Sequence, residues 1–411
     1  MASFRISNTH KLIFLVFVII VLKLAAMLNK PANLISGSHT VRNLTEKEFL
    51  DMGFDSSQNF DIDENAEVNK KVTEEMKIII DRLRDQIRQE TKGYKLPSNR
   101  EVESLIPERG GTPMRSVVIT TWRSGSTFIG GVLDSHPATF HFSEPLTDFR
   151  TVQVRGEPLG TLAVRALRSL LTCNYRVLGR YLERSKEYTW LSTHNTRLWA
   201  HCENHKDICY EPEFLTPVCR LFPFQSMKVV HIRLRLVEEL LADPNLNVRV
   251  LYLMRDPRGV MSSRASLGWC RKSPDCGSPT HVCADLVDDY AAALRFDKLF
   301  PGKFKVVRYE DMSLRPHEVM PEIFSFFGLQ YHRDVQDFVK VHTTQNNKNK
   351  YSTFRNSSAQ ALLWRTKLDY RKVRQLQTTC RLAMAAWGYL PAHNASHQAV
   401  FNPLVQPFSL T

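Results

Sequence analysis

The 411-residue chain has no internal repeat and no low-complexity tract, which argues against a repeat architecture and against a chain that is disordered throughout. Its eight cysteines include no C-x-x-C pair, the spacing most typical of zinc sites, and none of them precedes residue 170. The cysteines therefore favour disulfide bonds over a metal centre.

The composition is that of a globular protein with an anionic partner. With 43% hydrophobic residues the chain can bury a sizeable core, and we expect one catalytic domain with appendages. The net charge of +13 indicates nucleic acid, a phosphorylated cofactor, an acidic polysaccharide or a membrane surface as the partner. Charge alone does not choose among these four.

The N-terminus carries a candidate membrane anchor. Residues 12–28 are apolar except for Lys23, and a run of this length is at the lower end of the ~17 to 25 residues that span a bilayer. Arg5 and Lys11 precede the run, so the positive-inside rule predicts a cytosolic tail at residues 1–11 and a luminal body. A cleaved signal peptide is the alternative, and both interpretations place the body in the secretory pathway.

Other features suit an oxidising lumen. The number of cysteines is even, as expected where disulfides form, and six of them make two local clusters: Cys202, Cys209 and Cys219, then Cys270, Cys276 and Cys283. Three N-x-S/T patterns are potential glycosylation acceptors in that compartment: Asn43, Asn356 and Asn394.

Residues 29–112 are predicted to form a luminal stem. Val72, Met76, Ile79 and Leu83 follow a heptad spacing over roughly two heptads. One interpretation is a short coiled coil that joins two copies of the chain as a homodimer. The alternative, which we weigh equally, is one amphipathic helix that lies on the catalytic domain.

From residue 113 apolar strands alternate with helices. The predicted strands are 116–121, 248–254 and 303–310, with helices at 126–133 and 316–327. This order predicts an α/β fold, a parallel sheet flanked by helices, with ligands at the carboxyl ends of its strands.

The turn after the first strand, RSGST, has the character of a P-loop-like phosphate cradle. The start of a helix presents N–H groups and a positive dipole end, Gly125 permits close approach, and Arg123 can fork onto phosphate oxygens. An ordinary solvated turn is the alternative. No lysine follows Gly125 as in G-x-x-x-x-G-K-[ST], which argues against phosphoryl transfer from a nucleoside triphosphate.

Five segments in order resemble the Golgi carbohydrate 6-O-sulfotransferases: RSGSTF at 123–128, FSEP at 142–145, LMRDPRGVMSSR at 253–264, RYEDM at 308–312 and YSTFRNSS at 351–358. The resemblance covers about residues 113–392. It implies a sulfotransferase domain, which we place at 113–396 before a tail at 397–411.

The resemblance also implies a function. The family members are single-pass type II Golgi membrane enzymes with a luminal catalytic domain. They transfer sulfate from 3′-phosphoadenylyl sulfate to the 6-hydroxyl of galactose, N-acetylglucosamine or N-acetylgalactosamine in a glycan or glycosaminoglycan. We therefore expect a glycan partner, no nucleic acid and no required metal.

The resemblance implies binding roles for individual residues of this sequence. The family's first motif binds the 5′-phosphosulfate and corresponds to Arg123, Ser124, Gly125, Ser126, Thr127 and Phe128. Its second motif binds the 3′-phosphate and corresponds to Arg255 and Ser263. Tyr351 and Arg355 match the C-terminal loop that is expected to cover the nucleotide.

Sulfuryl transfer needs a base for the sugar hydroxyl and a cation for the leaving phosphate. We assign these roles to Glu144 and Arg123. Alternatively, Glu144 orients Arg123 or caps a helix. If the strand ATFHF runs on to Glu144, alternation puts Phe142 on the face of Glu144 and His141 on the other, which makes His141 the weaker base.

Other polar residues are harder to assign. Lys228 is expected at the start of a strand, where it either contacts the donor or acceptor or is a surface lysine. For Trp364 and Arg365, packing in the core is favoured over adenine stacking, and Asp311 is expected to pair with Arg308 or cap a helix.

The acceptor groove is expected within residues 150–225. The arginines of the basic stretch 165–184 either bind an acidic chain or form a solvated face. The sequence does not choose among the three sugars, and a tyrosylprotein sulfotransferase or a luminal glycan-binding protein without turnover are the alternatives.

Overall fold

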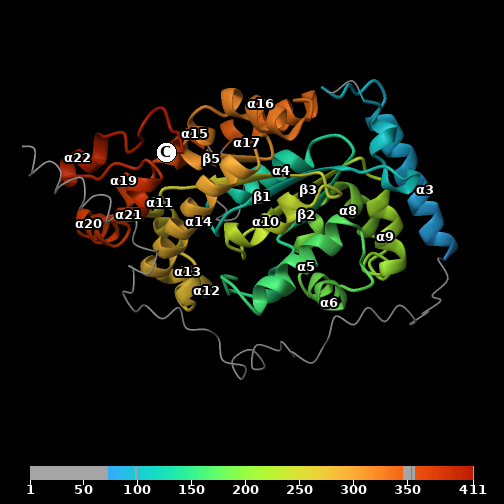
Figure 1. The fold of residues 1–411 in the computed structure, drawn as a ribbon, viewed down its shortest axis with the longest axis horizontal. Coiled ribbons are helices and arrows are strands. Elements are labelled where there is room, and N and C mark those ends of the chain that lie inside the picture. The colour runs from blue at the N-terminus through green and yellow to red at the C-terminus, as the bar shows by residue number, and fades with distance from the viewer. Residues whose placement is uncertain (1–72, 98–99, 346–352, 354–356, 411) are drawn as a thin grey trace, which may run out of the picture. The chain divides into compact units, whose positions relative to one another are not determined.

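The structure is a computed structural model that describes residues 73–97, 100–345, 353 and 357–410 (Figure 1). The expected cytosolic tail, the anchor and the first part of the stem lie outside the described residues, as do Tyr351, Arg355, Asn43 and Asn356. Within the described ranges no helix is both long and apolar enough to cross a membrane.

Five parallel strands form one sheet in the order β2-β3-β1-β4-β5 (Figure 1). The strands are β1 (Met114–Ile119), β2 (Thr139–Ser143), β3 (Phe224–Val229), β4 (Val248–Met254) and β5 (Phe304–Arg308). The predicted α/β class and parallel sheet are confirmed. The third predicted strand ends earlier than expected, at Arg308, because the chain turns there into a helix.

Helices cover both faces of the sheet (Figure 1). On one side α4 (Ser126–Asp134) packs on β2 and β3, and α16 (Pro316–Phe327) packs on β1. On the other side α10 (Glu238–Ala242) packs on β4, and α14 (Pro279–Leu299) packs on β5. All residues of β3 are buried, as expected for a parallel strand covered on two faces.

The remaining α-helices surround this core. They are α3 (Glu74–Glu90), α5 (Leu159–Leu171), α6 (Gly179–Glu187), α7 (Trp190–Thr193), α8 (Thr196–Cys202), α9 (Pro212–Arg220), α11 (Pro257–Arg264), α12 (Gly268–Arg271), α13 (Pro274–Gly277), α15 (Tyr309–Leu314), α17 (Arg333–Thr344), α18 (Ser357–Ala361), α19 (Trp364–Lys367), α20 (Tyr370–Thr379), α21 (Arg381–Ala386) and α22 (Ala395–Val400).

Helix α3 lies on the domain of its own chain. Its apolar stripe is buried, and α3 packs against α9: the stripe contains Met76, Ile79, Ile80, Leu83 and Ile87. Glu90 at its end accepts a 2.7 Å hydrogen bond from Arg197 of α8. The structure therefore shows the second alternative, an amphipathic helix on the catalytic domain, because the described apolar residues of the heptad pattern are buried within one chain. Val72 lies outside the described residues.

Residues 397–410, which we expected to form a tail, pack on the domain. Leu404 forms a β-bridge with Tyr389, and the Arg308 guanidinium donates to the Val405 carbonyl at 3.0 Å. Phe401 packs against the buried ring of Trp364. Burial of these apolar side chains makes the C-terminal segment part of the fold.

The eight cysteines form four disulfides, as predicted in preference to zinc. The pairs are Cys173–Cys219, Cys202–Cys209, Cys270–Cys276 and Cys283–Cys380. The two local clusters are not closed units, because each sends one cysteine to a distant partner.

Candidate active site

The loop between β1 and α4 has the backbone shape of an anion cradle. Arg123 and Gly125 have positive φ angles of 69° and 89°, and Ser124 between them does not. Alternation of this kind turns successive N–H groups toward one point, at the positive end of the α4 dipole. A side chain at Gly125 would place its Cβ 2.4 Å from the ring of Tyr309, so only glycine fits.

Two buried polar atoms beside this loop lack hydrogen-bond partners within the described ranges, namely Ser124 Oγ and Arg255 Nε. Leaving such groups unsatisfied costs about 1 to 3 kcal/mol each, more for a charged group. Both atoms can donate to an anion. The cradle and these donors therefore fit a phosphorylated ligand.

Arg255 and Ser263 lie beside the loop. Arg123 Nε donates to Ser263 Oγ at 3.0 Å, and Arg255 Nη1 donates to the Arg123 carbonyl at 2.8 Å. The Arg255 guanidinium also stacks 4.1 Å above the ring of Tyr309. In RDPR the carboxylate of Asp256 pairs with Arg258 at 2.8 Å, so Asp256 does not neutralise Arg255 there.

Glu144 follows directly after β2 and pairs with Lys228 of β3. The distance from Lys228 Nζ to Glu144 Oε1 is 2.6 Å. Burial raises the pKa of Glu144, but Lys228 and the nearby His231 and His194 together bring it below its ordinary value of 4.5. Glu144 is therefore ionised at neutral pH.

The backbone at Glu144 interrupts the alternation of β2. Glu144 has a φ of 47°, in the left-handed region that non-glycine residues rarely adopt, and strain of this kind clusters at functional sites. The strand ends at Ser143, so the condition for predicting which face Glu144 shares with Phe142 is not met. The Glu144 N–H donates to the Lys228 carbonyl at 2.9 Å.

Lys228 corrects our expectation in two respects. It is the fifth of six residues in β3, near the carboxyl end, and it is 1% exposed. It is therefore neither at the start of a strand nor a surface lysine. The ion pair with Glu144 explains how a buried lysine is tolerated.

Three histidines lie near this pair. His141 is buried against Gly130 of α4, hydrogen-bonds to Ser226 Oγ at 2.8 Å, and has a pKa well below 6.5 because of burial. Burial also lowers the pKa of His194, and that of His231 to about 4. All three rings are neutral at pH 7.

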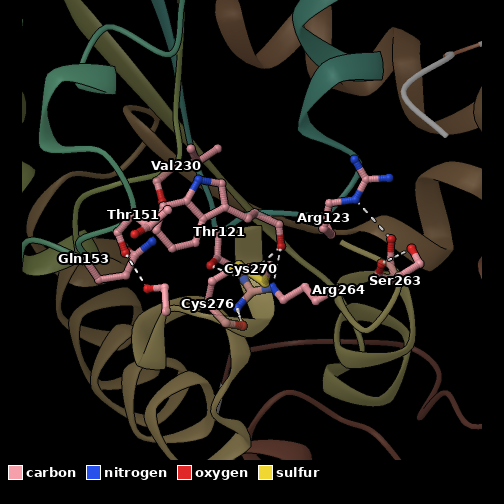
Figure 2. Close-up of a disulfide and its surroundings, with 12 residues drawn as sticks. Thr121, Arg123, Thr151, Gln153, Val230, Ser263, Arg264, Cys270 and Cys276 are labelled. Carbon is pink, nitrogen blue, oxygen red and sulfur yellow. Dashed lines mark hydrogen bonds between the residues drawn. A yellow bond between two sulfur atoms is a disulfide. The ribbon is translucent and has the colours of Figure 1, made fainter. Parts of the chain in front are cut away.

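A buried arginine, Arg264, holds the backbone that leads into the anion loop (Figure 2). Arg264 of α11 donates to the Trp122 carbonyl from Nε at 3.0 Å and from Nη2 at 2.8 Å, and to Thr121 Oγ1 at 2.7 Å. Its Nη1 donates to the carbonyl of Cys276 at 2.8 Å, beside the disulfide to Cys270. The guanidinium thus joins the anion loop to the disulfide loop.

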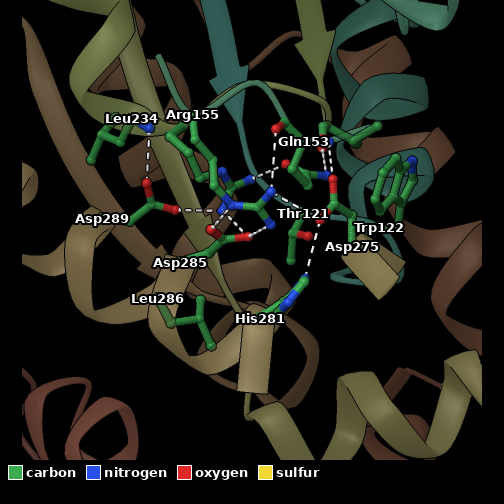
Figure 3. Close-up of polar contacts among 12 residues, drawn as sticks. Thr121, Trp122, Gln153, Arg155, Leu234, Asp275, His281, Asp285, Leu286 and Asp289 are labelled. Atoms are coloured by element: carbon green, nitrogen blue, oxygen red, sulfur yellow. Dashed lines mark hydrogen bonds and ion pairs between the residues drawn. The ribbon is translucent and has the colours of Figure 1, made fainter. Parts of the chain in front are cut away.

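The disulfide loop is held in turn by an ion network (Figure 3). Asp275, between the two cysteines, accepts from Arg155 at 2.8 Å. Arg155 also pairs with Asp285 of α14 at 2.6 Å, and Arg233 pairs with Asp289 of the same helix at 2.9 Å. The network thus links the disulfide loop to α14.

The structure brings most of the sequence-predicted site to one edge of the sheet. The Thr120 N–H donates to the Val229 carbonyl, one residue beyond the Lys228 carbonyl that accepts from Glu144, so the loop and the carboxylate adjoin the same end of β3. Trp364 is buried in the core and Asp311 pairs with Arg308 at 2.7 Å, as predicted.

Sequence reasoning missed several contributors: Trp122, His231, Arg264 and Tyr309. Arg264 and Tyr309 lie inside the quoted motifs, which is the only signal that the sequence offers for them. In the part of the chain that the structure describes, no cluster of three or more His, Cys, Asp or Glu side chains could hold a metal ion.

A glycine-containing loop with the backbone shape of an anion cradle, at the carboxyl edge of a parallel sheet, is typical of proteins that bind a phosphorylated ligand there. Residues 113–388 match the sulfotransferase domain family. The chain belongs to the sulfotransferase family and is an enzyme of that class, which uses 3′-phosphoadenylyl sulfate as donor.

Relatives support this assignment. The chain is 27% identical over 328 residues to carbohydrate sulfotransferase 1 of Danio rerio, covering 66% of this chain and 77% of that protein. It is 26% identical over 334 residues to carbohydrate sulfotransferase 5 of Homo sapiens, covering 71% and 81%. The resemblance to carbohydrate sulfotransferases is thereby confirmed.

Similarity to a solved structure is weaker. The sulfotransferase domain of the Synechococcus PCC 7002 olefin synthase is 16% identical with a TM-score of 0.38, covering 68% of this chain and 96% of that one. The family assignment rests on the sequence match, since a TM-score of this size carries no argument.

Proposed function

We propose that the chain transfers sulfate from 3′-phosphoadenylyl sulfate to the 6-hydroxyl of a galactose, N-acetylglucosamine or N-acetylgalactosamine residue in a glycan. The observation that carries the proposal is an ionised carboxylate, Glu144, at the same end of β3 as the anion loop. The names of the relatives favour a carbohydrate acceptor.

The donor would bind through the anion loop. The loop from Arg123 to Phe128 would hold the 5′-phosphosulfate, with Ser124 Oγ satisfied by a phosphate or sulfate oxygen. Arg255 and Ser263 would hold the 3′-phosphate, to which the unpaired Arg255 Nε would donate. Tyr351 and Arg355 would cover the nucleotide.

The acceptor hydroxyl would lose its proton to Glu144. As this proton moves to the carboxylate, the sugar oxygen forms a bond to sulfur and the bond from sulfur to the phosphate oxygen breaks. Arg123 would stabilise the negative charge that develops on the leaving phosphate oxygen. Lys228 would keep Glu144 ionised until the hydroxyl arrives.

The experiment measures transfer of radiolabelled sulfate by the full-length protein to a panel of desulfated glycans and to an acidic tyrosine peptide. Label on a glycan, unaffected by a metal chelator, is the expected result. Label on the peptide alone would favour a tyrosylprotein sulfotransferase. Label on neither, with retained glycan binding, would favour a binding protein without turnover.

We also propose a single-pass type II Golgi topology, with residues 1–11 cytosolic, an anchor at 12–28 and a luminal domain. Four disulfides among the described residues support an oxidising compartment. Protease added to intact Golgi vesicles should leave residues 73–411 protected, and digestion of the domain would contradict this orientation.

A further inference from the structure

Two tryptophans of the domain are exposed, although most large aromatic side chains are buried at least in part. Trp190 of α7 is 40% exposed and Trp269 of α12 is 39% exposed. By contrast, Trp122, Trp364 and Trp387 are buried. An exposed aromatic ring beside an active site is an available contact surface.

Trp190 lies on the β2 side of Glu144. Helix α7 packs on β2, and Glu144 is the residue after that strand. The Trp190 ring meets His194 edge to face, with centroids 5.8 Å apart at 81°. His194 lies close enough to Glu144 and Lys228 to interact with both electrostatically.

Trp269 lies on the other side, toward β1. Its ring meets Trp122 at 6.1 Å and 77°, and Trp122 meets His231 at 5.1 Å and 89°. His231 follows β3 and lies within electrostatic range of Glu144. Trp122 lies three residues beyond the end of β1.

The order of the strands in the sheet places the residues that make these ring contacts in a row. Glu144 follows β2, His231 follows the adjacent β3, and Trp122 follows β1 on the far side of β3. Trp190 is therefore linked to the surroundings of the carboxylate through His194 on the β2 side, and Trp269 through Trp122 and His231 beyond β3.

We propose that Trp190 and Trp269 bind the sugar rings that flank the sugar sulfated at Glu144, so that the enzyme acts within an oligosaccharide. This inference rests on the proposed function. A pyranose has an apolar C–H face that can cover an aromatic ring while its hydroxyls stay in water.

Binding of an acidic acceptor by basic side chains is the weaker explanation for the surface around Trp190. Arg184 pairs with Glu187 at 2.5 Å, and Lys186 pairs with Glu211 at 3.7 Å. Arg184, at the end of the basic stretch, and Lys186, just beyond it, thus already have carboxylate partners. Stacking on Trp190 is therefore the favoured contact for an acceptor there, and it does not require the acceptor to be charged.

The test compares KM for a tetrasaccharide with KM for the matching monosaccharide glycoside, using the glycan that the wild-type protein sulfates best. Trp190→Ala and Trp269→Ala should each raise KM for the tetrasaccharide about three- to tenfold, from the loss of one aromatic contact. KM for the monosaccharide, kcat and affinity for adenosine 3′,5′-bisphosphate should stay unchanged. Trp190→Phe and Trp269→Phe should restore most of the loss.

Leu382→Ala is the control, because Leu382 of α21 is an apolar side chain that is 60% exposed. It should change neither KM. An unchanged tetrasaccharide KM in either tryptophan variant overturns the two-sided site, as does an equal rise for both acceptors. The wild type is assayed before any variant. If it sulfates no glycan, the proposed function itself fails, independently of the tryptophan variants.

Discussion

Lys228 Nζ lies 2.6 Å from Glu144 Oε1, and the lysine side chain of this pair is 2% exposed while the glutamate is 19% exposed. The pair therefore has one buried partner and one partner that is open to a ligand. A carboxylate held ionised at the mouth of a site can accept a proton from an incoming hydroxyl. In the proposed mechanism the buried lysine would set the pH range in which Glu144 does so.

Lys228→Met should move the acid limb of the kcat profile to higher pH. In the wild type Lys228 lowers the pKa of Glu144 against the effect of burial, so the base stays unprotonated down to below pH 4.5. Without the lysine, burial remains and the pKa rises. The measurement is kcat from pH 4 to pH 8.

The matched control for this variant is Lys305→Met. Lys305 pairs with Glu322 at 3.6 Å, away from the site, so its loss should leave the profile unchanged. An acid limb at the same pH in Lys228→Met and the wild type would contradict the role given to the pair.

Arg255→Ala should abolish most of the thermal stabilisation by adenosine 3′,5′-bisphosphate. A ligand that binds only the folded state stabilises it by about 2.7 kcal/mol at a hundredfold excess over Kd. Arg295→Ala is the control, since Arg295 is a surface arginine whose side chain is 62% exposed. Equal melting shifts in the wild type and Arg255→Ala would remove Arg255 from the donor site.

Arg264→Lys should weaken both the fold and donor binding. One ammonium group cannot reach the Trp122 carbonyl, Thr121 Oγ1 and the Cys276 carbonyl as the guanidinium does. We expect a loss of about 2 to 3 kcal/mol in unfolding free energy, from buried groups left unpaired. The affinity for adenosine 3′,5′-bisphosphate should fall as well, because the loop loses its support.

Denaturant unfolding and calorimetric titration measure these two losses. Arg249→Lys is the control. Arg249 is a partly buried arginine far from the loop, and it donates to the Phe326 carbonyl at 2.6 Å. The variant should lose stability without losing affinity. Normal donor binding in Arg264→Lys would show that the loop does not depend on Arg264.

Glu310 should make stability depend on pH. Burial and the adjacent Asp256 raise its pKa to about 7. A raised acid pKa contributes stability that is complete below the ordinary value near 4.5 and is lost as pH rises through 7. The wild type should therefore lose up to about 3 kcal/mol relative to Glu310→Gln between pH 5 and pH 8, at about 1.4 kcal/mol per pKa unit.

Denaturant unfolding of both proteins at pH 5, 6, 7 and 8 gives this difference directly. The glutamine keeps an acceptor for the Asp256 N–H, which Glu310 binds at 3.0 Å, and has no proton to lose. A constant difference across this range would mean that Glu310 is not protonated in the folded protein.

Patterns local in sequence predicted the sheet and the anion loop well. The strand at 248–254 and the helix at 316–327 have the predicted bounds, because apolar runs and the proline at a helix start are local signals. The loop was equally readable, since its glycine and hydroxyl residues are adjacent.

Contacts between distant segments were not predictable in the same way. Nothing in the sequence marks Lys228 as the partner of Glu144, 84 residues earlier, or Arg264 as the support of Trp122, 142 residues earlier. Such pairs depend on the strand order, and many strand orders fit the same alternation of strands and helices. The positive φ at Glu144 is likewise set by tertiary contacts.

In the mechanism that we propose, Glu144 takes the proton from a sugar 6-hydroxyl. Single-turnover sulfation of a glycan, with labelled donor and full-length protein, tests it most directly when wild type and Glu144→Gln are compared beside calorimetric titration of adenosine 3′,5′-bisphosphate. We expect a rate about 10² to 10⁴ times lower in Glu144→Gln with unchanged nucleotide affinity, because a positioned base contributes a factor of that size. Near wild-type turnover with normal nucleotide affinity would contradict it.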